Sequence, residues 1–300
     1  MSPKIKTSLL PALFFLFSVL ATVQVSAQNN AEQKNEQANT VKKTCNFYVF
    51  TQDASKKFDF LGTTALIRIC IKSMLMKKKL YVIVARNSRQ VAGKIISILN
   101  RQNGLIGNIW FDSHGLYKQG YSSFHIGSDE FSYKNIHDSA ATAALKELAR
   151  YCNDQTNVGI GSCYGGATFT FPGTAKVPPG RMNGDSLVMG LGEIFSSAVI
   201  YGSESWVMAK PGIFNNNFGF AGYPLGKRYR TTYWQPVWER LGKWNRYSKS
   251  SGIFEPVNTV ALNKQGIINV RVRNYQELFK GQKAVWKNLT RLEKTSTHDN

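Results

Sequence analysis

The chain has few acidic residues and few histidines. Its 300 residues hold 18 Asp and Glu against 38 Lys and Arg, a formal charge of +20 at pH 7, and only four His. No Cys or His pair has zinc-finger spacing and no His-Glu-x-x-His occurs, so we predict neither a metal site nor a cofactor. The positive charge favours polyanionic partners; for an exported protein these are a cell-surface polymer or lipid rather than nucleic acid. Charge kept for solubility alone explains the same excess.

Long apolar runs are missing after residue 27. Before it, Lys4 and Lys6 precede an apolar stretch over residues 9–23, and residues 25–27 are small. This order is typical of a cleaved secretion signal. An uncleaved anchor is the alternative, but the apolar stretch is short for a span of about 20 residues. We therefore predict a signal peptide over residues 1–27. The mature chain is then secreted, or periplasmic or in the cell envelope, and is not transmembrane.

Cysteine is scarce, with four residues in the chain: Cys45, Cys70, Cys152 and Cys163. An oxidising compartment favours disulfides. If Cys163 is a free reactive thiol, at most one pair can form among the other three. Two structural disulfides that include Cys163 are the alternative, and they would exclude a catalytic role for it.

Helix-like and strand-like segments alternate through the middle of the chain. We expect strands over residues 45–50, 80–85, 106–112, 158–162, 198–202 and 267–272. We expect helices over residues 60–76, 89–100, 140–151 and 185–195. Residues 121–133 read as a hairpin or an ordered loop. The alternation predicts an α/β fold, with a mainly parallel sheet flanked by helices.

The domain organisation follows from shifts in composition. After the signal, residues 28–43 are polar and predict a disordered lead-in. Residues 44–215 would form one α/β domain, a usual size for a single core. Residues 216–300 form an aromatic and basic C-terminal extension, packed on or beside that domain.

Two of the predicted strands end in reactive side chains. The strand over residues 106–112 is followed by Ser113, His114 and Gly115, and the strand over residues 158–162 is followed by Cys163. Ligands bind outside the carboxyl ends of strands in open α/β sheets. If the two strands are parallel neighbours, the imidazole and the thiol meet there, which suits nucleophilic catalysis.

The chain has an apolar block that ends in His-Gly and then a second apolar block that ends in a small residue and Cys. In this order of motifs it resembles the caspase-like superfamily of cysteine peptidases over about residues 80–206. The separation of about 50 residues matches the caspase pattern. The resemblance implies that Cys163 is the nucleophile and His114 the general acid. It also implies that the backbone N–H groups of Gly115 and Cys163 form the oxyanion hole.

Substrate binding is implied by the same resemblance. Residues 203–206 match the Ser-Trp segment that lines the cleft of caspases, so Ser203, Glu204, Ser205 and Trp206 are candidates. Val207 stands where caspases have Arg, and Gly161 stands where metacaspases and clostripain have an Asp that binds a basic side chain. Asp185 and Glu204 are the acidic residues that could line a pocket instead. We expect a peptide or protein substrate.

Two other interpretations of the sequence remain open. Gly161-x-Cys163-x-Gly165 also fits the nucleophile elbow of α/β-hydrolases, but that fold needs a His after the nucleophile, and only His298 follows. In the second, the chain is a catalytically inactive caspase-like scaffold that binds anionic surface ligands. The high positive charge and the missing acidic specificity residue favour it.

Overall fold

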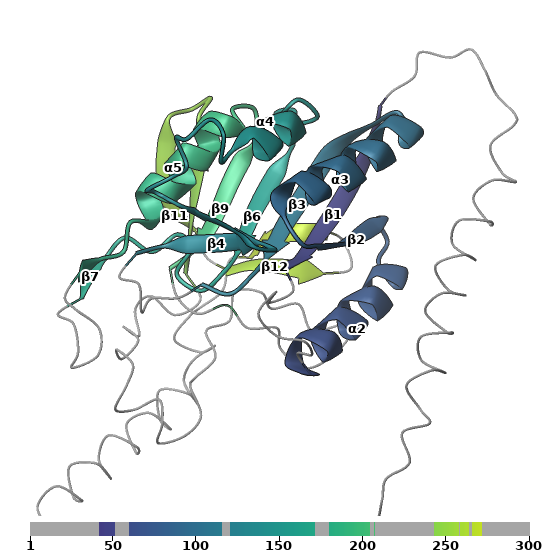
Figure 1. Cartoon of the computed structure of the whole chain (residues 1–300), viewed down its shortest axis with the longest axis horizontal. Coiled ribbons are helices and arrows are strands. Elements are labelled where there is room, and N and C mark those ends of the chain that lie inside the picture. Colours follow the sequence, from purple (N-terminus) through teal and green to yellow (C-terminus); the bar gives the residue numbers. More distant parts are fainter. Residues whose placement is uncertain are drawn as a thin grey trace, which may run out of the picture. The chain divides into compact units, whose positions relative to one another are not determined.

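A seven-stranded sheet with the order β11-β10-β9-β6-β3-β1-β2 forms the centre of the fold (Figure 1). The computed structural model describes residues 42–51, 60–115, 121–171, 180–204, 207, 243–257, 259–263 and 266–271. The predicted signal peptide and nearly all of the predicted lead-in lie outside these residues. The described part belongs to the compact unit Lys43–Asn300, apart from Lys42.

Five neighbouring strands of the sheet are parallel and two at one edge are antiparallel. The parallel strands are β1 (Lys43–Thr51), β2 (Leu80–Ala85), β3 (Gly104–Asp112), β6 (Asn157–Gly161) and β9 (Val199–Ser203). The antiparallel strands are β10 (Trp244–Ser248) and β11 (Ile253–Val257). The prediction of an α/β fold with a mainly parallel sheet is confirmed. Two strands of the predicted C-terminal extension, β10 and β11, continue this same sheet.

Four helices and three small hairpins complete the described structure. The helices are α2 (Phe60–Met74), α3 (Ser88–Gln102), α4 (Ala143–Ala149) and α5 (Gly184–Ile194). The hairpins are β4 (Ser123–Ile126) with β5 (Asp129–Ser132), β7 (Thr170–Phe171) with β8 (Gly180–Arg181), and β12 (Thr259–Asn263) with β13 (Gly266–Arg271). No helix among the described residues is long and apolar enough to cross a membrane.

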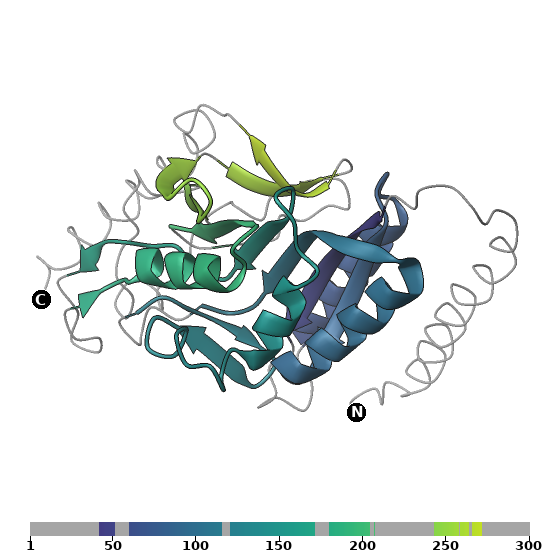
Figure 2. The same cartoon turned by 90° about the horizontal axis from the view of Figure 1, so that it is seen from above.

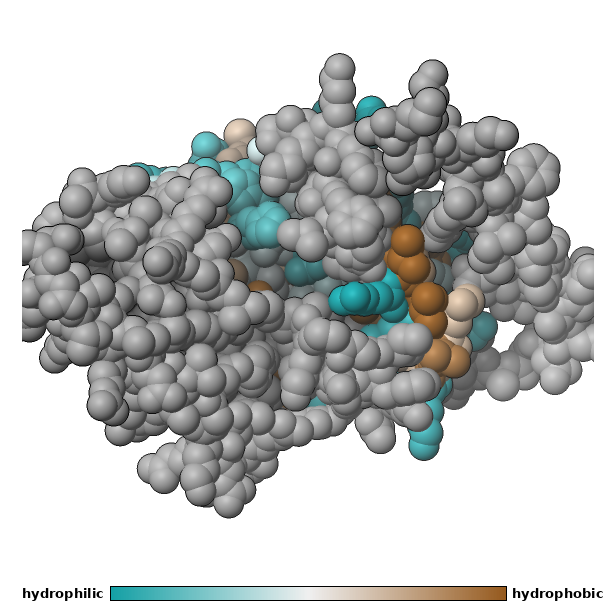
Figure 3. Space-filling model, turned by 90° about the horizontal axis from the view of Figure 1, so that it is seen from below, coloured by the Kyte–Doolittle hydropathy of each residue, from teal (hydrophilic) through white to brown (hydrophobic). Residues whose placement is uncertain are grey.

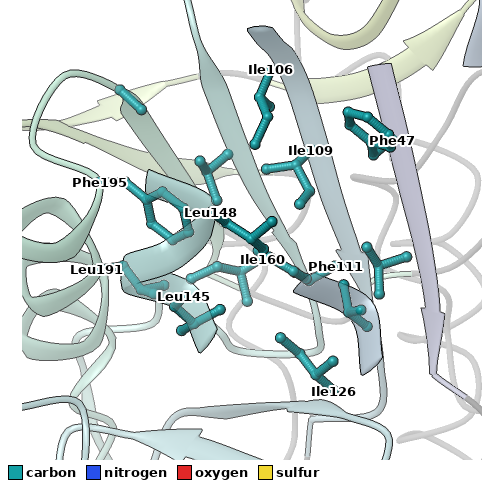
Figure 4. Packing of buried hydrophobic residues seen from close by; sticks show 14 of the residues in the cluster. Phe47, Ile106, Ile109, Phe111, Ile126, Leu145, Leu148, Ile160, Leu191 and Phe195 are labelled. Atoms are coloured by element: carbon teal, nitrogen blue, oxygen red, sulfur yellow. The ribbon is translucent and has the colours of Figure 1, made fainter. Parts of the chain in front are cut away.

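Both faces of the sheet are covered, which is why its strands read as near-continuous apolar runs. Helices α3, α4 and α5 pack on one face, and alternate strand side chains such as Phe47, Ile109 and Ile160 point into that layer (Figure 4). On the other face, α2 and the β12–β13 hairpin cover Tyr48 and Trp110. Figure 2 shows helices α3, α4 and α5 along one side of the sheet and the yellow hairpin on the other.

The predicted helix over residues 140–151 is wrong in its bounds, since α4 is only Ala143–Ala149. Asp138 or Ser139 could cap a helix that begins at Ala140, but Asp138 does not do so. Its carboxylate instead accepts from the N–H groups of Ala140 and Ala141, at 2.8 and 3.4 Å, within turns that precede α4. The Asp side chain thus stabilises a local turn that competes with the first helical turn.

Three asparagines tie the central strands together at the same level. The Asn108 amide donates to Asn46 Oδ1 at 2.7 Å, and the Asn157 amide donates to Asn108 Oδ1 at 3.1 Å. These residues are direct register partners on β1, β3 and β6. If one of these strands shifted by one residue against its neighbour, the amides would be unpaired. The three asparagines, which we call the asparagine ladder, therefore help to fix the register of the strands. The positions of His114 and Cys163 past the carboxyl ends of β3 and β6 depend on that register.

Trp110 lies in the centre of the core on the sheet face that β12–β13 covers, among Trp244, Val260 and Ile267. Its ring is fully buried, and its centroid lies 5.4 Å from that of Trp244. We predict that Trp110→Ala lowers the free energy of unfolding by about 3–5 kcal/mol, because it leaves a large cavity. Urea denaturation measures this. Tyr133→Ala, at an exposed position, is the control and should change stability little; equal losses in both variants would contradict the packing described.

Candidate functional site

The candidate site lies at the carboxyl edge, the line where the parallel strands β3 and β6 end. The two strands are parallel neighbours as predicted, with Asp112 paired to Gly161. The Ser113 N–H extends the pairing to Gly161 O at 3.5 Å. His114 and Cys163 each follow two residues after this pair, so they occupy equivalent positions on adjacent strand ends.

The backbone at Gly115 touches the backbone at Cys163. A Cβ atom at Gly115 would lie 2.0 Å from the carbonyl oxygen of Cys163 and 2.8 Å from its nitrogen. No side chain fits in that space, so glycine is required for the two segments to approach. The structure therefore brings the His114-Gly115 segment and Cys163 together.

Cys163 occupies a tight turn. The Gly165 N–H donates to Ser162 O at 3.2 Å, so Cys163 and Tyr164 are the two central residues. Tyr164 has φ of 60°, in the left-handed region where glycine is usual. Its ring is buried and meets Phe169 edge to face, at a centroid distance of 5.9 Å. Packing thus holds a strained backbone directly after the thiol, a feature that clusters at functional sites.

Strand β4 lies across the carboxyl edge and binds three of the segments that meet there (Figure 1). The Thr51 hydroxyl, at the end of β1, donates to His125 O at 2.9 Å. The His125 N–H donates to the Ser113 hydroxyl at 3.0 Å, and the Ser162 hydroxyl donates to Ser123 O at 2.9 Å. The serines that flank the two reactive residues are therefore held by one strand.

Backbone N–H groups surround the Cys163 thiol. The Val207 N–H donates to Cys163 Sγ at 3.4 Å, and the sulfur lies 3.9 Å from Val207 O. The N–H groups of Gly115 and of Cys163 itself also favour the ionised thiol. Burial, the largest effect, raises the pKa of the Cys163 thiol, and the charge of Asp112 raises it further. The three N–H groups lower that pKa. They provide the kind of donor cluster that stabilises a developing negative charge.

Asp112 is a buried carboxyl beside this thiol. The Tyr48 hydroxyl donates to Asp112 Oδ2 at 2.7 Å. Burial raises the pKa of Asp112 to about 6, and the hydrogen bond from Tyr48 partly opposes this rise. Burial, and next the Asp112 charge, raise the pKa of Tyr48 well above its usual value, so Tyr48 stays a hydrogen-bond donor.

His114 is exposed at the same edge. Within the described part of the chain, no hydrogen bond joins its imidazole to the Cys163 thiol. An exposed imidazole can turn toward a bound substrate, and catalytic hydrogen bonds are often loose before substrate binds. His298, the residue that an α/β-hydrolase reading needs, lies outside the described residues.

The predicted substrate-binding residues have different surroundings. Ser203 is fully buried and its carbonyl accepts from the Gly166 N–H at 2.8 Å. Glu204 is also buried, and the Asn245 amide donates to its Oε1 at 2.9 Å. Asp185 of α5 instead forms an ion pair with Arg181 of β8 at 2.6 Å. Ser205 and Trp206 lie outside the described residues.

Gly161 cannot carry the side chain that metacaspases have at that position. A Cβ atom there would lie 2.2 Å from Trp110 Nε1 and 2.9 Å from Phe111 O. The indole fills the space above Gly161, so a negative charge near the thiol has to come from another position. Asp112, the register partner of Gly161, and the buried Glu204 are the carboxyls that end or directly follow neighbouring strands at this edge.

All four cysteines are within the described residues, and all are free thiols. The expectation of a structural disulfide is therefore not met. Burial raises the pKa of Cys152 to about 12, which makes that thiol unreactive at neutral pH. Among the residues that the structure describes, no group of three or more His, Cys, Asp or Glu side chains could hold a metal ion.

The sequence did not reveal three parts of this site. Val207 acts through its backbone N–H, which any residue except proline provides. Tyr48 comes from β1, 64 positions before its partner Asp112. Asn245 of β10 holds Glu204 and also donates to Gly166 O at 2.8 Å. Only Asp112 had a local signal, since it stands two residues before His114.

Comparison with known proteins adds no relative: no protein-family model, no curated protein and no solved structure matches this chain.

The contact at Gly115 gives a testable prediction. In Gly115→Ala the added methyl would overlap the Cys163 backbone, so one segment must move, and we expect a loss of about 1–3 kcal/mol in unfolding free energy. Chemical denaturation measures it. Gly93→Ala is the matched control, because nothing lies within 4 Å of a Cβ at Gly93 in α3. If Gly115→Ala were as stable as Gly93→Ala, the close approach would be wrong.

The buried Asp112 predicts a pH dependence of stability. Its pKa is about 6 in the folded chain against an ordinary value of 3.8. Between these values the folded chain keeps a proton that the unfolded chain has released, so unfolding free energy falls as pH rises from about 4 to about 6. The fall is at most about 3 kcal/mol.

Asp112→Asn should remove this fall, because an amide does not titrate and can still accept from Tyr48. Denaturation at several pH values between about 3.5 and 7, a range that spans the two pKa values, would measure how the unfolding free energy changes with pH. Asp154→Asn, at an exposed loop position, removes the same charge and should leave the fall intact. If the unfolding free energy of Asp112→Asn still fell over this pH range, Asp112 would not be the cause of the fall.

Proposed function

We propose that the chain is an exported cysteine peptidase with a caspase-like α/β domain, in which Cys163 and His114 hydrolyse peptide bonds. One observation carries the proposal: the backbone of Gly115 lies against that of Cys163, with N–H groups directed at the thiol sulfur. A thiol at a strand end, a histidine on the adjacent strand end and a cluster of donors are what acyl transfer through a thioester needs.

In this proposal each group has one role. The Cys163 thiol gives its proton to His114, and the sulfur attacks the carbonyl carbon of the peptide bond. The carbonyl oxygen gains negative charge and accepts from the N–H groups of Gly115 and Cys163. His114 protonates the leaving amine, and the C–N bond breaks. Water then hydrolyses the thioester, which releases the acid and restores the thiol.

The arrangement of the sheet supports a caspase-like domain. The candidate His and Cys follow neighbouring parallel strands, β3 and β6, and helix α4 lies between them in the sequence. The strand after Cys163, β9, leads to Ser203 and Glu204 and on to Val207, whose N–H reaches the sulfur at 3.4 Å. This is the segment that the resemblance assigns to the substrate cleft.

Glu204 is the better of the two predicted acidic residues for a substrate pocket. It lies just past the carboxyl end of β9, and Asn245 orients its carboxylate. The Asp185 carboxylate is already paired with Arg181. A carboxylate next to the scissile bond would favour peptides with a basic side chain.

The second candidate function is a catalytically inactive scaffold that binds anionic surface ligands. The raised pKa of Cys163 and the exposed His114, which is not hydrogen-bonded to it, favour this alternative. Salt-sensitive retention of the wild-type chain on an anionic polymer, with no peptide hydrolysis, would support it.

We predict that Cys163→Ala abolishes hydrolysis of a mixed peptide library and that His114→Ala lowers kcat/KM by roughly 10²–10⁴-fold, the usual worth of a positioned acid. Cleavage is read by mass spectrometry. Cys70→Ala and His137→Ala, which change a half-buried thiol and an exposed imidazole elsewhere, should keep full activity. Hydrolysis that persists in Cys163→Ala with the fold intact would rule the peptidase out.

A further inference from the structure

The C-terminal end of α2 exposes two adjacent apolar side chains. Met74 is 60% exposed and Leu75 is 46% exposed, whereas Ile69 of the same helix is buried against the sheet. The other large exposed apolar residues of the described chain are Tyr133, Met189, Ile253 and Val270, and no two of these are neighbours in the sequence. Single exposed apolar residues are common on protein surfaces, but adjacent ones on a helix end are less so.

The chain around these two residues carries only positive charge. From Phe60 to Phe111 there are nine Lys and Arg residues and no Asp or Glu. Lys77, Lys78 and Lys79 follow directly after Met76, and all three are exposed. Within the described part of the chain, none of these three lysines has an ion-pair partner.

Two of the other exposed apolar residues lie on elements whose acidic side chains form ion pairs. Met189 lies on α5, where Glu193 pairs with Lys249. Ile253 begins β11, where Glu255 pairs with Arg246. Only at the end of α2, within the described structure, do two adjacent exposed apolar side chains stand beside three consecutive exposed lysines. Lys79 Nζ also lies 5.0 Å from the centroid of the Tyr81 ring. Figure 3 views the side on which Figure 1 draws α2 and shows hydrophobic atoms grouped at the surface beside hydrophilic ones.

We propose that Met74, Leu75, Lys77, Lys78 and Lys79, which we call the α2 docking face, bind the surface of an anionic lipid bilayer. The two apolar side chains enter the headgroup region, and the lysines contact anionic headgroups. Charge complementarity selects this partner, since a neutral surface would leave three adjacent ammonium groups without counter-charges. Two apolar side chains make the binding reversible rather than permanent.

Docking through this face leaves the candidate site open. Lys79 immediately precedes Leu80, the first residue of β2, so the lysines lie at the amino ends of the parallel strands. Cys163 lies two residues past the carboxyl end of β6, which is five residues long. At about 3.3 Å per residue the two positions are separated by the length of a strand. A bilayer bound at one end therefore does not cover the other.

Vesicle co-sedimentation tests the proposal. The protein should begin at Gln28, because the apolar residues 9–23 would bind lipid by themselves. This chain keeps the entire compact unit Lys43–Asn300. We expect it to sediment with vesicles of phosphatidylcholine and phosphatidylglycerol and to remain free with vesicles of phosphatidylcholine alone. Salt at about 0.5 M should release it, because the screening length then falls to about 4 Å.

Two variants address the two parts of the face. Met74→Gln with Leu75→Gln should weaken the partition coefficient at least about tenfold. Replacing Lys77, Lys78 and Lys79 by Gln should weaken it about fivefold per charge. Circular dichroism and thermal unfolding would show that both variants are folded.

Matched controls keep the proposal falsifiable. Met189→Gln with Ile253→Gln removes comparable apolar exposure elsewhere. Replacing Lys42, Lys134 and Lys146 by Gln removes equal charge from exposed positions. Both should bind as the parent does. Equal loss in the lysine control would mean that net charge alone drives binding, and unchanged binding of the Met74/Leu75 variant would mean that the face does not enter the bilayer. Either result overturns the proposal, as does equal binding to neutral vesicles.

Discussion

The parallel pairing of β3 with β6 is the constraint on which the candidate site depends. Because Asp112 lies opposite Gly161, the chain leaves both strands at the same level, and Gly115 comes against the Cys163 backbone. The asparagine ladder at the other end of the strands and strand β4 at the carboxyl edge hold this register from two sides. The fold thus fixes the backbone around the thiol while His114 stays at the surface.

Two opposing electrostatic effects meet at the thiol. Burial and the Asp112 charge raise the pKa of Cys163, and three backbone N–H groups lower it. In the resting protein this balance favours the protonated thiol, which is weakly nucleophilic. The same N–H groups would stabilise an oxyanion once a peptide carbonyl occupies the site. The geometry therefore suits a nucleophile that becomes active when substrate is bound.

The sequence predicted the parallel sheet well because each of its five parallel strands contains a short apolar run. Residues 80–85 were predicted as a strand and form β2, since a run of β-branched and aromatic residues with both faces buried has few alternatives. Strand β10 was missed. Its Asn245 is polar yet buried, because it bonds to Glu204 and Gly166, and it lies on the same face as Tyr247. The strand therefore lacks the regular alternation of apolar and polar residues that would have marked it. His114, Gly115 and Cys163 could be found from motifs, whereas Tyr48 and Val207 act through long-range or backbone contacts that leave no local pattern.

The most direct measurement of the central claim is the rate at which Cys163 reacts with a peptidyl chloromethyl ketone compared with chloroacetamide, followed by intact-protein mass spectrometry in the parent and in His114→Ala. If Cys163 is a peptide-directed nucleophile, the peptidyl reagent reacts much faster than the small one, and this advantage is lost without His114. Equal rates for the two reagents, or an advantage that is unchanged in His114→Ala, would contradict the account.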